Sequence, residues 1–312
     1  MNFAEEFVAG LRAQPRAIAP KWFYDAEGSR LFERICELPE YYPTRTELAL
    51  LAQHAPAIAD RIGPGAEIVE FGAGASVKVR LLLDALTAPG LSPRRFVPVD
   101  ISGEHLSHAA AALRNDYPGL AVEPVAADFT AALTLPPAAG PRLGFYPGSS
   151  IGNFDPAAAE ALLRRFRGWL AGGPLLIGVD LVKDPALLHA AYNDASGVTA
   201  AFNLNLLARA NRELGADFEL AGWAHSAFYQ PALRRIEMHL VSRRRQRVCV
   251  DGQRFEFDEG DSMHTENSYK YTVDGFHALA HRAGFKATKV WTDAERRFSL
   301  HWLEPAKQLE TP

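Results

Sequence analysis

The segment VEFGAGASVK, residues 69–78, runs from a short apolar and acidic stretch into two glycines that are separated by one residue. A strand followed by a glycine turn and a helix is typical of α/β folds. The glycines let the backbone approach a ligand closely, and the helix that follows offers its N-terminal amides. The segment therefore predicts a ligand-binding turn at the end of a strand and leaves the kind of ligand open.

Strands and helices alternate from this segment onward. The expected strands cover 66–71, 94–102, 120–129, 141–154 (with a break at Gly148) and 173–182, and the expected helices cover 76–86, 103–117 and 155–170, the last with Asp155 as N-cap. Strands that alternate with helices favour a parallel sheet covered on both faces. Residues 272–285 predict one more helix, and 286–293 and 298–305 predict two antiparallel strands joined by a short turn.

The flanking parts of the chain have a different pattern. Residues 1–60 are expected to be helical around an aromatic turn, PEYYPTR, bounded by Pro39 and Pro43. Residues 189–215 are expected to be mostly helical, and 234–263 to form a β-hairpin that turns at Asp251-Gly252. We predict one domain from residues 51–185 plus 270–312 and a second, mixed α+β domain from 1–50 plus 186–269.

Chemical groups that suit a ligand stand at four of the predicted strand ends. They are the glycines 72 and 74, Asp100, Asp128-Phe129 and the break from Gly148 to Asn153. In open α/β sheets, ligands bind outside the carboxyl ends of the strands. The glycine turn lacks the GxxxxGK[ST] pattern of a P-loop, and Val77 replaces the third glycine of a dinucleotide site.

S-adenosylmethionine fits these strand ends better than a phosphate or a dinucleotide. It has no phosphate, so a shorter glycine turn is sufficient. Asp100 would accept hydrogen bonds from its ribose hydroxyls, and Asp128 with Phe129 would hold its adenine. The terminal hairpin of the sheet also suits the methyltransferase form of this fold.

Composition excludes several other classes of protein. A formal net charge of -4 gives no electrostatic reason to expect nucleic acid. The isolated Cys36 and Cys249 indicate neither a disulfide framework nor a zinc site, and no metal is predicted. No run approaches the roughly 20 apolar residues of a membrane span, and the N-terminus does not read as a signal peptide. We expect a cytoplasmic, monomeric protein with a small-molecule substrate.

Six segments of the chain together resemble the histidine N-α-methyltransferases, which make hercynine, the first intermediate of ergothioneine biosynthesis. The most specific is PKWFYDAEGSRLFERICELPEYYPTR, and the others are VEFGAGASVKVRLLLDAL, GSSIGNF, AYNDASGVTAAFNLN, RRIEMHL and TENSYKY. The resemblance implies a Rossmann-like class I S-adenosylmethionine-dependent methyltransferase sheet with a separate substrate-binding domain. It implies three successive methyl transfers to the α-amine of L-histidine, with S-adenosylmethionine as cofactor.

The resemblance also assigns roles to residues. Cofactor-contacting positions are Gly72, Lys78, Asp100, Asp128 and Phe129, with Tyr41 between cofactor and substrate. The substrate carboxylate would be held by Asn153 and Tyr192, its amine would lie near Tyr24, and its imidazole would be read by Glu266 and Ser268, with Met238 and Gly148 lining the pocket. Tyr24 and Tyr41 are thus the expected catalytic residues.

Residue chemistry supports part of this assignment independently. On a strand, Glu266 and Ser268 would share one face and would suit a ring with one N–H and one acceptor nitrogen. Two alternatives stay open: methylation of another amino acid, such as tryptophan or tyrosine, and a nucleotide-binding α/β protein without this activity.

Overall fold

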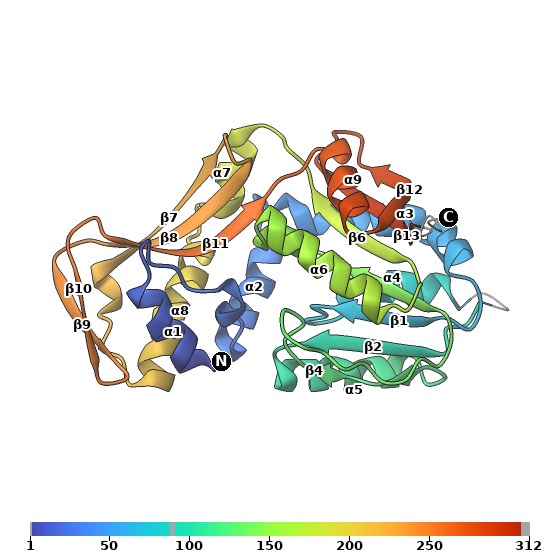
Figure 1. Cartoon of the computed structure of the whole chain (residues 1–312), viewed down its shortest axis with the longest axis horizontal. Coiled ribbons are helices and arrows are strands. Elements are labelled where there is room, and N and C mark those ends of the chain that lie inside the picture. Colours follow the sequence, from blue (N-terminus) through green and yellow to red (C-terminus); the bar gives the residue numbers. More distant parts are fainter. Residues whose placement is uncertain (1, 88–90, 307–312) are drawn as a thin grey trace, which may run out of the picture. The chain divides into compact units, whose positions relative to one another are not determined.

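A computed structural model of the chain describes residues 2–87 and 91–306, which form two compact units (Figure 1). The first unit comprises the chain up to Tyr42 and Lys183–Tyr269. The second comprises Pro43–Val182 and the chain from Lys270 onward. The division thus lies at 42/43, 182/183 and 269/270, whereas the prediction placed it at 50/51, 185/186 and 269/270. Which unit binds which ligand remains a prediction.

The second unit contains a mostly parallel sheet in the order β12-β13-β6-β5-β1-β2-β3, with β4 also paired to β2. Its strands are β1 (Glu67–Phe71), β2 (Arg95–Asp100), β3 (Ala121–Val122), β4 (Val125–Ala126), β5 (Arg142–Tyr146), β6 (Leu175–Asp180), β12 (Phe285–Thr292) and β13 (Phe298–Pro305). Within this sheet, among the residues that the structure describes, only the β6–β13 and β12–β13 pairs are antiparallel. The predicted α/β sheet with a terminal antiparallel hairpin is confirmed.

Helices cover both faces of this sheet, which explains why every residue of β1 is buried. The helices are α3 (Tyr42–Ile62), α4 (Val77–Ala85), α5 (Gly103–Asp116), α6 (Pro156–Trp169) and α9 (Val273–Arg282). One core cluster joins the sheet to apolar residues of α3, α4 and α5, and a second joins it to α6 and α9. The predicted N-cap of α6 is confirmed, because the Asp155 side chain accepts a hydrogen bond from the Ala158 amide.

The predicted strand over 120–129 is wrong in its extent. The structure has two dipeptide strands, β3 and β4, and Asp128-Phe129 lies in the turn beyond them. Pro124 falls in the gap between the strands and has no N–H to donate to the ladder. The two ligand-binding candidates of this segment therefore belong to a loop.

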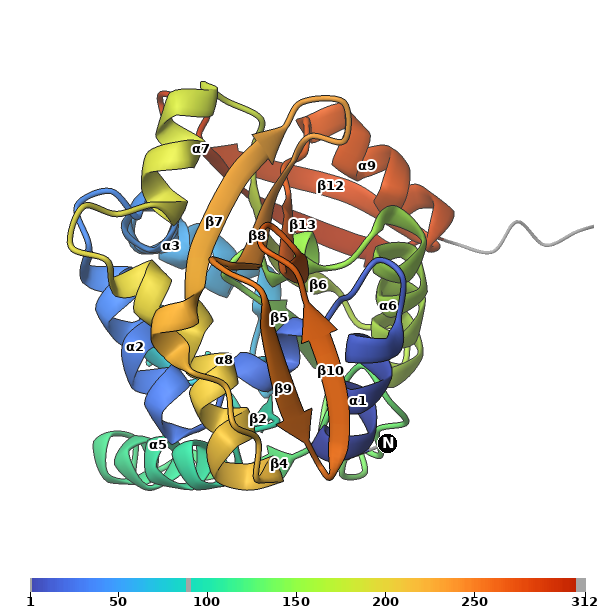
Figure 2. The same ribbon diagram turned by 90° about the vertical axis from the view of Figure 1, so that its left-hand side faces the viewer.

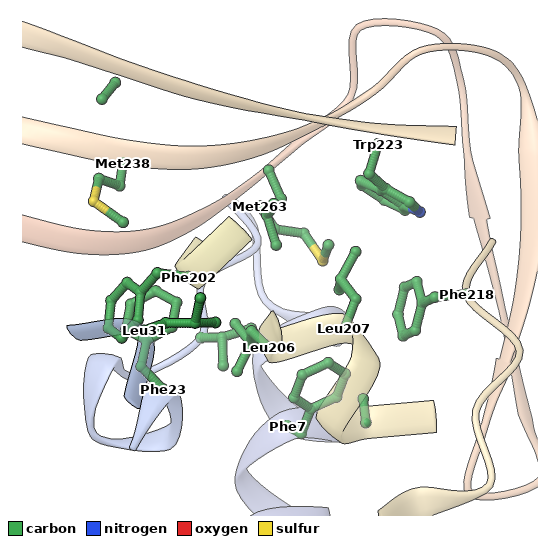
Figure 3. Packing of buried hydrophobic residues seen from close by; sticks show 14 of the residues in the cluster. Phe7, Phe23, Leu31, Phe202, Leu206, Leu207, Phe218, Trp223, Met238 and Met263 are labelled. Atoms are coloured by element: carbon green, nitrogen blue, oxygen red, sulfur yellow. The ribbon is translucent and has the colours of Figure 1, made fainter. Parts of the chain in front are cut away.

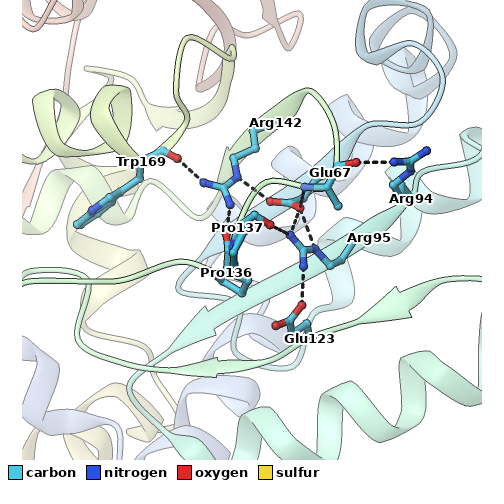
Figure 4. A network of polar contacts seen from close by, with 9 residues as sticks. Glu67, Arg94, Arg95, Glu123, Pro136, Pro137, Arg142 and Trp169 are labelled. Carbon is cyan, nitrogen blue, oxygen red and sulfur yellow. Dashed lines mark hydrogen bonds and ion pairs between the residues drawn. The ribbon is translucent and has the colours of Figure 1, made fainter.

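A buried polar network holds the amino end of β1, opposite the end with the glycine turn (Figure 4). The fully buried Glu67 accepts hydrogen bonds from Arg95 and Arg142, and Arg95 also bonds Glu123. Burial by itself would raise the pKa of Glu67, but hydrogen bonds from Arg142, the Ala139 amide and Arg95 lower it below its ordinary value. These charges tie together strands β1, β2 and β5.

The first unit has a helical layer under a three-stranded antiparallel sheet, β11-β8-β7. Its strands are β7 (Trp223–Gln230), β8 (Arg235–Ser242), β9 (Gln246–Val250), β10 (Gln253–Phe257) and β11 (Ser262–Tyr269); its α-helices are α1 (Phe3–Arg12), α2 (Ala26–Glu37), α7 (Pro185–Tyr192) and α8 (Val198–Leu214). Helix α8 packs on β7 and β8 (Figure 2). The core between the layers includes Phe7, Phe202, Trp223 and Met263 (Figure 3).

Short 3₁₀ segments complete both units. The first unit has η1 (Pro20–Phe23) and η3 (Leu220–Gly222), and the second has η2 (Ser150–Asn153). Segment η2 follows β5, which ends at Tyr146, shortly before the predicted break at Gly148.

Two predictions for the first unit need correction. Within 234–263, only β9 and β10 form the hairpin around Asp251-Gly252, because β8 instead pairs with β7 and β11. Pro43 does not bound the aromatic turn, since helix α3 already begins at Tyr42. A proline in the first helical turn needs no amide hydrogen bond and is tolerated there.

Asp194 caps helix α8 and gives the first testable prediction. Its carboxylate accepts hydrogen bonds from the Val198 and Thr199 amides at 2.8 Å. Burial raises its pKa, but the hydrogen bonds from Thr199, Val198 and Ser196 outweigh this and lower the pKa from 3.8 to about 2. A lowered pKa stabilises the folded state above the unfolded pKa, and this stability is lost as the pH falls through about 2.

We expect Asp194→Ala to lower the free energy of unfolding by about 2 kcal/mol at pH 7. The gap between parent and variant should be roughly half as large at pH 3. Denaturant unfolding at both pH values measures it, with the exposed Glu259→Ala as a control. A gap that is unchanged at pH 3 would show that the carboxylate charge does not stabilise the helix.

Candidate functional site

The glycine turn at the carboxyl end of β1 has the backbone conformation that its sequence predicts. Gly72 and Gly74 have φ angles of +71° and +49°, a region that other residues rarely adopt. A Cβ atom built on Gly72 would meet the ring of Phe129 at 3.7 Å. Two candidates that are distant in the sequence therefore lie side by side.

Asp100, at the end of β2, is hydrogen-bonded to the same turn. Its Oδ2 accepts from the Gly74 amide and its Oδ1 from the Ser102 amide, both at 2.9 Å. Each carboxylate oxygen has a second lone pair, so the group can still accept a ligand hydroxyl. Asp100 thus joins the glycine turn to β2, in addition to its predicted role.

Asp128 and Phe129 occupy the loop after β4. The Asp128 Oδ1 accepts a hydrogen bond from the Thr130 amide at 2.8 Å. The half-buried Phe129 ring lies edge-on to Phe71 and Tyr146, with centroids 6.3 and 5.7 Å away. The strand ends therefore gather the glycine turn, two acids and one aromatic ring.

Glu47 of helix α3 connects two further candidates and was not predicted. Its side chain is completely buried, and Oε2 lies 2.6 Å from the Lys78 Nζ. Both of its oxygens accept from the Gly148 amide, at 3.0 and 2.9 Å. Glu47 lies on the apolar stripe of its helix with Leu50, Leu51 and Ile58, and a charge at such a position is the signal that would have found it.

Buried polar atoms around the glycine turn have no hydrogen-bond partner in the described part of the chain. They are Glu70 Oε2 and Ser76 Oγ. Burial raises the pKa of Glu70 well above its ordinary value, and Asp100 and Glu47 add to this while Lys78 opposes it. Buried unpaired polar groups are rare and call for a ligand or water. The donors and acceptors here fit a polar ligand such as S-adenosylmethionine.

The first unit brings together the predicted readers of the imidazole. The Tyr192 hydroxyl donates to Ser268 Oγ at 2.7 Å, and both residues are buried. Glu266 pairs in register with Met238 and Ser268 with Ile236, so both lie on the core-facing side of β11. The expectation that Glu266 and Ser268 share one strand face is consistent with this register.

Aromatic rings surround this polar group. The Tyr41 ring centroid is 6.4 Å from that of Tyr192, and the Tyr24 centroid is 5.8 Å from that of Phe202. Burial raises the pKa of Tyr41 well above its ordinary value, and neighbouring Tyr192 and Glu266 add to the shift. Tyr41 is therefore a neutral phenol at physiological pH.

A second set of polar residues contacts the backbone of Tyr192 and was not predicted from the sequence either. The His225 Nε2 lies 2.9 Å from the Tyr192 carbonyl oxygen, and His225 Nδ1 lies 2.9 Å from the Asn203 Nδ2. Asn203 in turn accepts from the Thr265 hydroxyl at 2.8 Å. Asn203 stands on the apolar face of α8, which is again the signal that a pattern search could use.

The predicted site residues divide between the units. The first unit holds Tyr24, Tyr41, Tyr192, Met238, Glu266 and Ser268, and the second holds Gly72, Lys78, Asp100, Asp128, Phe129, Gly148 and Asn153. Asn153 is half-buried in η2. In the described residues no helix is long and apolar enough to cross a membrane.

Comparison with known proteins points to one family. Residues 3–305 match a family described as histidine-specific, S-adenosylmethionine-dependent methyltransferases. A histidine N-alpha-methyltransferase of Mycolicibacterium smegmatis is 44% identical over 94% of this chain and 91% of its own. Ergothioneine biosynthesis protein 1 of Neurospora crassa is 31% identical over 98% of this chain and 35% of its own.

A solved structure has a similar fold at low sequence identity. It is described as a possible exported protein of Bordetella parapertussis, with 17% identity, a TM-score of 0.50, and coverage of 97% of this chain and 79% of its own. At this identity the likeness concerns the fold alone.

Proposed function

The chain belongs to the histidine-specific, S-adenosylmethionine-dependent methyltransferases, and from this premise we propose that it methylates the α-amine of L-histidine. Three successive transfers would give hercynine, N-α,N-α,N-α-trimethylhistidine. One relative is named a histidine N-alpha-methyltransferase and the other an ergothioneine biosynthesis protein, and both names support extending this role to the chain.

The observation that carries the substrate assignment is the polar group around Ser268. Imidazole has one N–H donor and one acceptor nitrogen. Glu266 supplies an acceptor, and Ser268 supplies a hydroxyl whose oxygen is fixed by Tyr192. A substrate without the imidazole nitrogens could form neither of these hydrogen bonds, which costs binding free energy.

Residues of the second unit have the chemistry to hold the cofactor. Asp100 would accept the ribose hydroxyls while its bonds to Gly74 and Ser102 keep it in place. Phe129 would pack on the adenine, and Asp128 would accept a hydrogen bond from the adenine amino group. The Lys78 ammonium group would pair with the carboxylate of the cofactor's amino-acid part. Glu47 would hold this Lys78 group in position. When bound, S-adenosylmethionine supplies an electrophilic methyl group.

The protein's remaining task is to prepare the amine. An ammonium group has no lone pair, so the α-amine must be deprotonated before each transfer. The nitrogen must then be held at roughly 3–3.5 Å from the methyl carbon. Tyr41 would act as a neutral hydrogen-bonding phenol, because its pKa is raised. The rings of Tyr24, Tyr41 and Phe202 would favour the cation that grows with each methylation.

Incubation with S-adenosylmethionine and each of the twenty amino acids, followed by mass spectrometry, tests the proposed function. Histidine should gain up to three methyl groups, and tryptophan and tyrosine should gain none. Methylation of another amino acid in preference to histidine would reject the substrate assignment. The absence of any methylated product would reject the proposed activity.

Asp100 gives a prediction for cofactor binding. Asp100→Ala should weaken S-adenosylhomocysteine binding by roughly 2–3 kcal/mol, because a charge-assisted hydrogen bond to the ribose is lost. Calorimetric titration measures the change, with the exposed Glu104→Ala as a control. Because Asp100 also holds the glycine turn, thermal unfolding is measured in parallel. A lower melting temperature with unchanged affinity would leave Asp100 only a structural role.

A further inference from the structure

Two histidines and a glutamate lie together on the face of the β11-β8-β7 sheet that points away from the core. His239 pairs in register with His264, and Glu237 pairs with Asn267. Their neighbours Met238 and Leu240 point into the core, so Glu237 and His239 lie on the opposite face. The proposed function uses none of these four residues.

The three side chains are close enough to share one ion. One ligand atom from each of Glu237, His239 and His264 lies within 4.8 Å of the others. The His239 Nε2 is 3.2 Å from the Glu237 Oε2. Two ligand atoms of a tetrahedral zinc ion with bonds of about 2.0–2.1 Å are about 3.3 Å apart. The Glu237–His239 pair already has this separation.

Each of these side chains is held by a further contact. One ring nitrogen of His264 is 3.0 Å from the Glu266 carbonyl oxygen, so its other nitrogen carries a lone pair. The His239 ring stacks on Phe228, with centroids 5.4 Å apart. Arg235 bonds Glu237 through Oε1, the oxygen not directed at His239. Metal-binding histidines commonly donate their second N–H to a carbonyl or carboxylate, and His264 has such a contact with the Glu266 carbonyl.

An unsatisfied oxygen stands next to the cluster. Asn267 lies opposite Glu237, and its Oδ1 is buried without a hydrogen-bond partner among the described residues. We propose that Glu237, His239 and His264 bind a divalent transition-metal ion of the zinc class. Two imidazoles and one carboxylate suit zinc, cobalt, nickel and copper better than magnesium or calcium, which prefer oxygen ligands.

The experiment titrates metal-free, untagged full-length protein with Co²⁺ and, separately, with Zn²⁺. The buffer contains no histidine, because histidine itself chelates these ions. We expect one Co²⁺ per chain with the visible absorption of a tetrahedral site, and a higher melting temperature with Zn²⁺. His239→Ala and His264→Ala should each weaken Zn²⁺ binding at least about 100-fold. Glu237→Gln should weaken it as well.

The exposed His189→Ala is the matched control and should bind Zn²⁺ like the parent. Circular dichroism shows whether each variant is folded, and His264→Gln replaces His264→Ala if the latter is not. Binding that persists undiminished in the folded cluster variants would overturn the proposal. So would the absence of one-to-one binding by the parent. Neither result depends on methyl transfer, so the site is tested separately from the proposed function.

Discussion

Replacing both Glu266 and Ser268 with alanine is expected to lower kcat/KM for histidine on the order of 10⁴-fold. The imidazole would lose both groups that we assign to its nitrogens. Tyr192 would also lose the Ser268 oxygen that its hydroxyl contacts at 2.7 Å. A site built to hydrogen-bond polar ring atoms discriminates this strongly, because the double variant would bury the imidazole nitrogens without these hydrogen-bond partners.

The comparison with cofactor binding makes this result specific. Affinity for S-adenosylhomocysteine should remain near the parent's, since every cofactor candidate except Tyr41 belongs to the other unit from Glu266 and Ser268. The exposed Glu259→Ala in the same unit serves as control. The parent should leave phenylalanine unmethylated, and a gain of activity on phenylalanine in the Glu266→Ala variant would support the assignment further. Histidine turnover at the parent's kcat/KM in the double variant would show that the ring is recognised elsewhere.

Glu47→Gln is expected to destabilise the fold by roughly 3–5 kcal/mol. The substitution removes the negative charge of the completely buried Glu47 and leaves the mostly buried Lys78 without its partner at 2.6 Å. Cofactor affinity should fall as well, because Glu47 also positions the Lys78 ammonium group that we assign to the cofactor. Denaturant unfolding and calorimetry with S-adenosylhomocysteine measure the two effects.

Two further variants separate charge from packing at Glu47. Asp60→Asn removes an exposed carboxylate from the same helix and should change neither quantity. Glu47→Gln combined with Lys78→Met should recover much of the stability, because an apolar side chain no longer leaves an unpaired buried charge. It should not recover cofactor affinity, since the ammonium that we assign to the cofactor is gone. Full recovery of both would remove Lys78 from the cofactor site.

Local patterns were sufficient where one element determines its own structure. The short buried strand β1, the helical spacing of α6 with its Asp155 cap, and the turn at Asp251-Gly252 were all predicted and are present. Patterns failed where the neighbours decide. Strand β7 lacks a regular alternation of buried and exposed residues, and it was not predicted. The strand predicted over 120–129 failed for a local reason instead, because Pro124 interrupts it.

The sequence by itself determined the α/β class, the glycine turn and the motifs that indicate histidine methylation. Each of these depends on residues close together in the chain or on a motif that can be read in order. Only the tertiary structure decided that Glu47 holds Lys78 and Gly148, and that His239 and His264 meet across two strands. The partners in these pairs are 25 or more positions apart, and strand register and helix packing, which no local pattern encodes, bring them together.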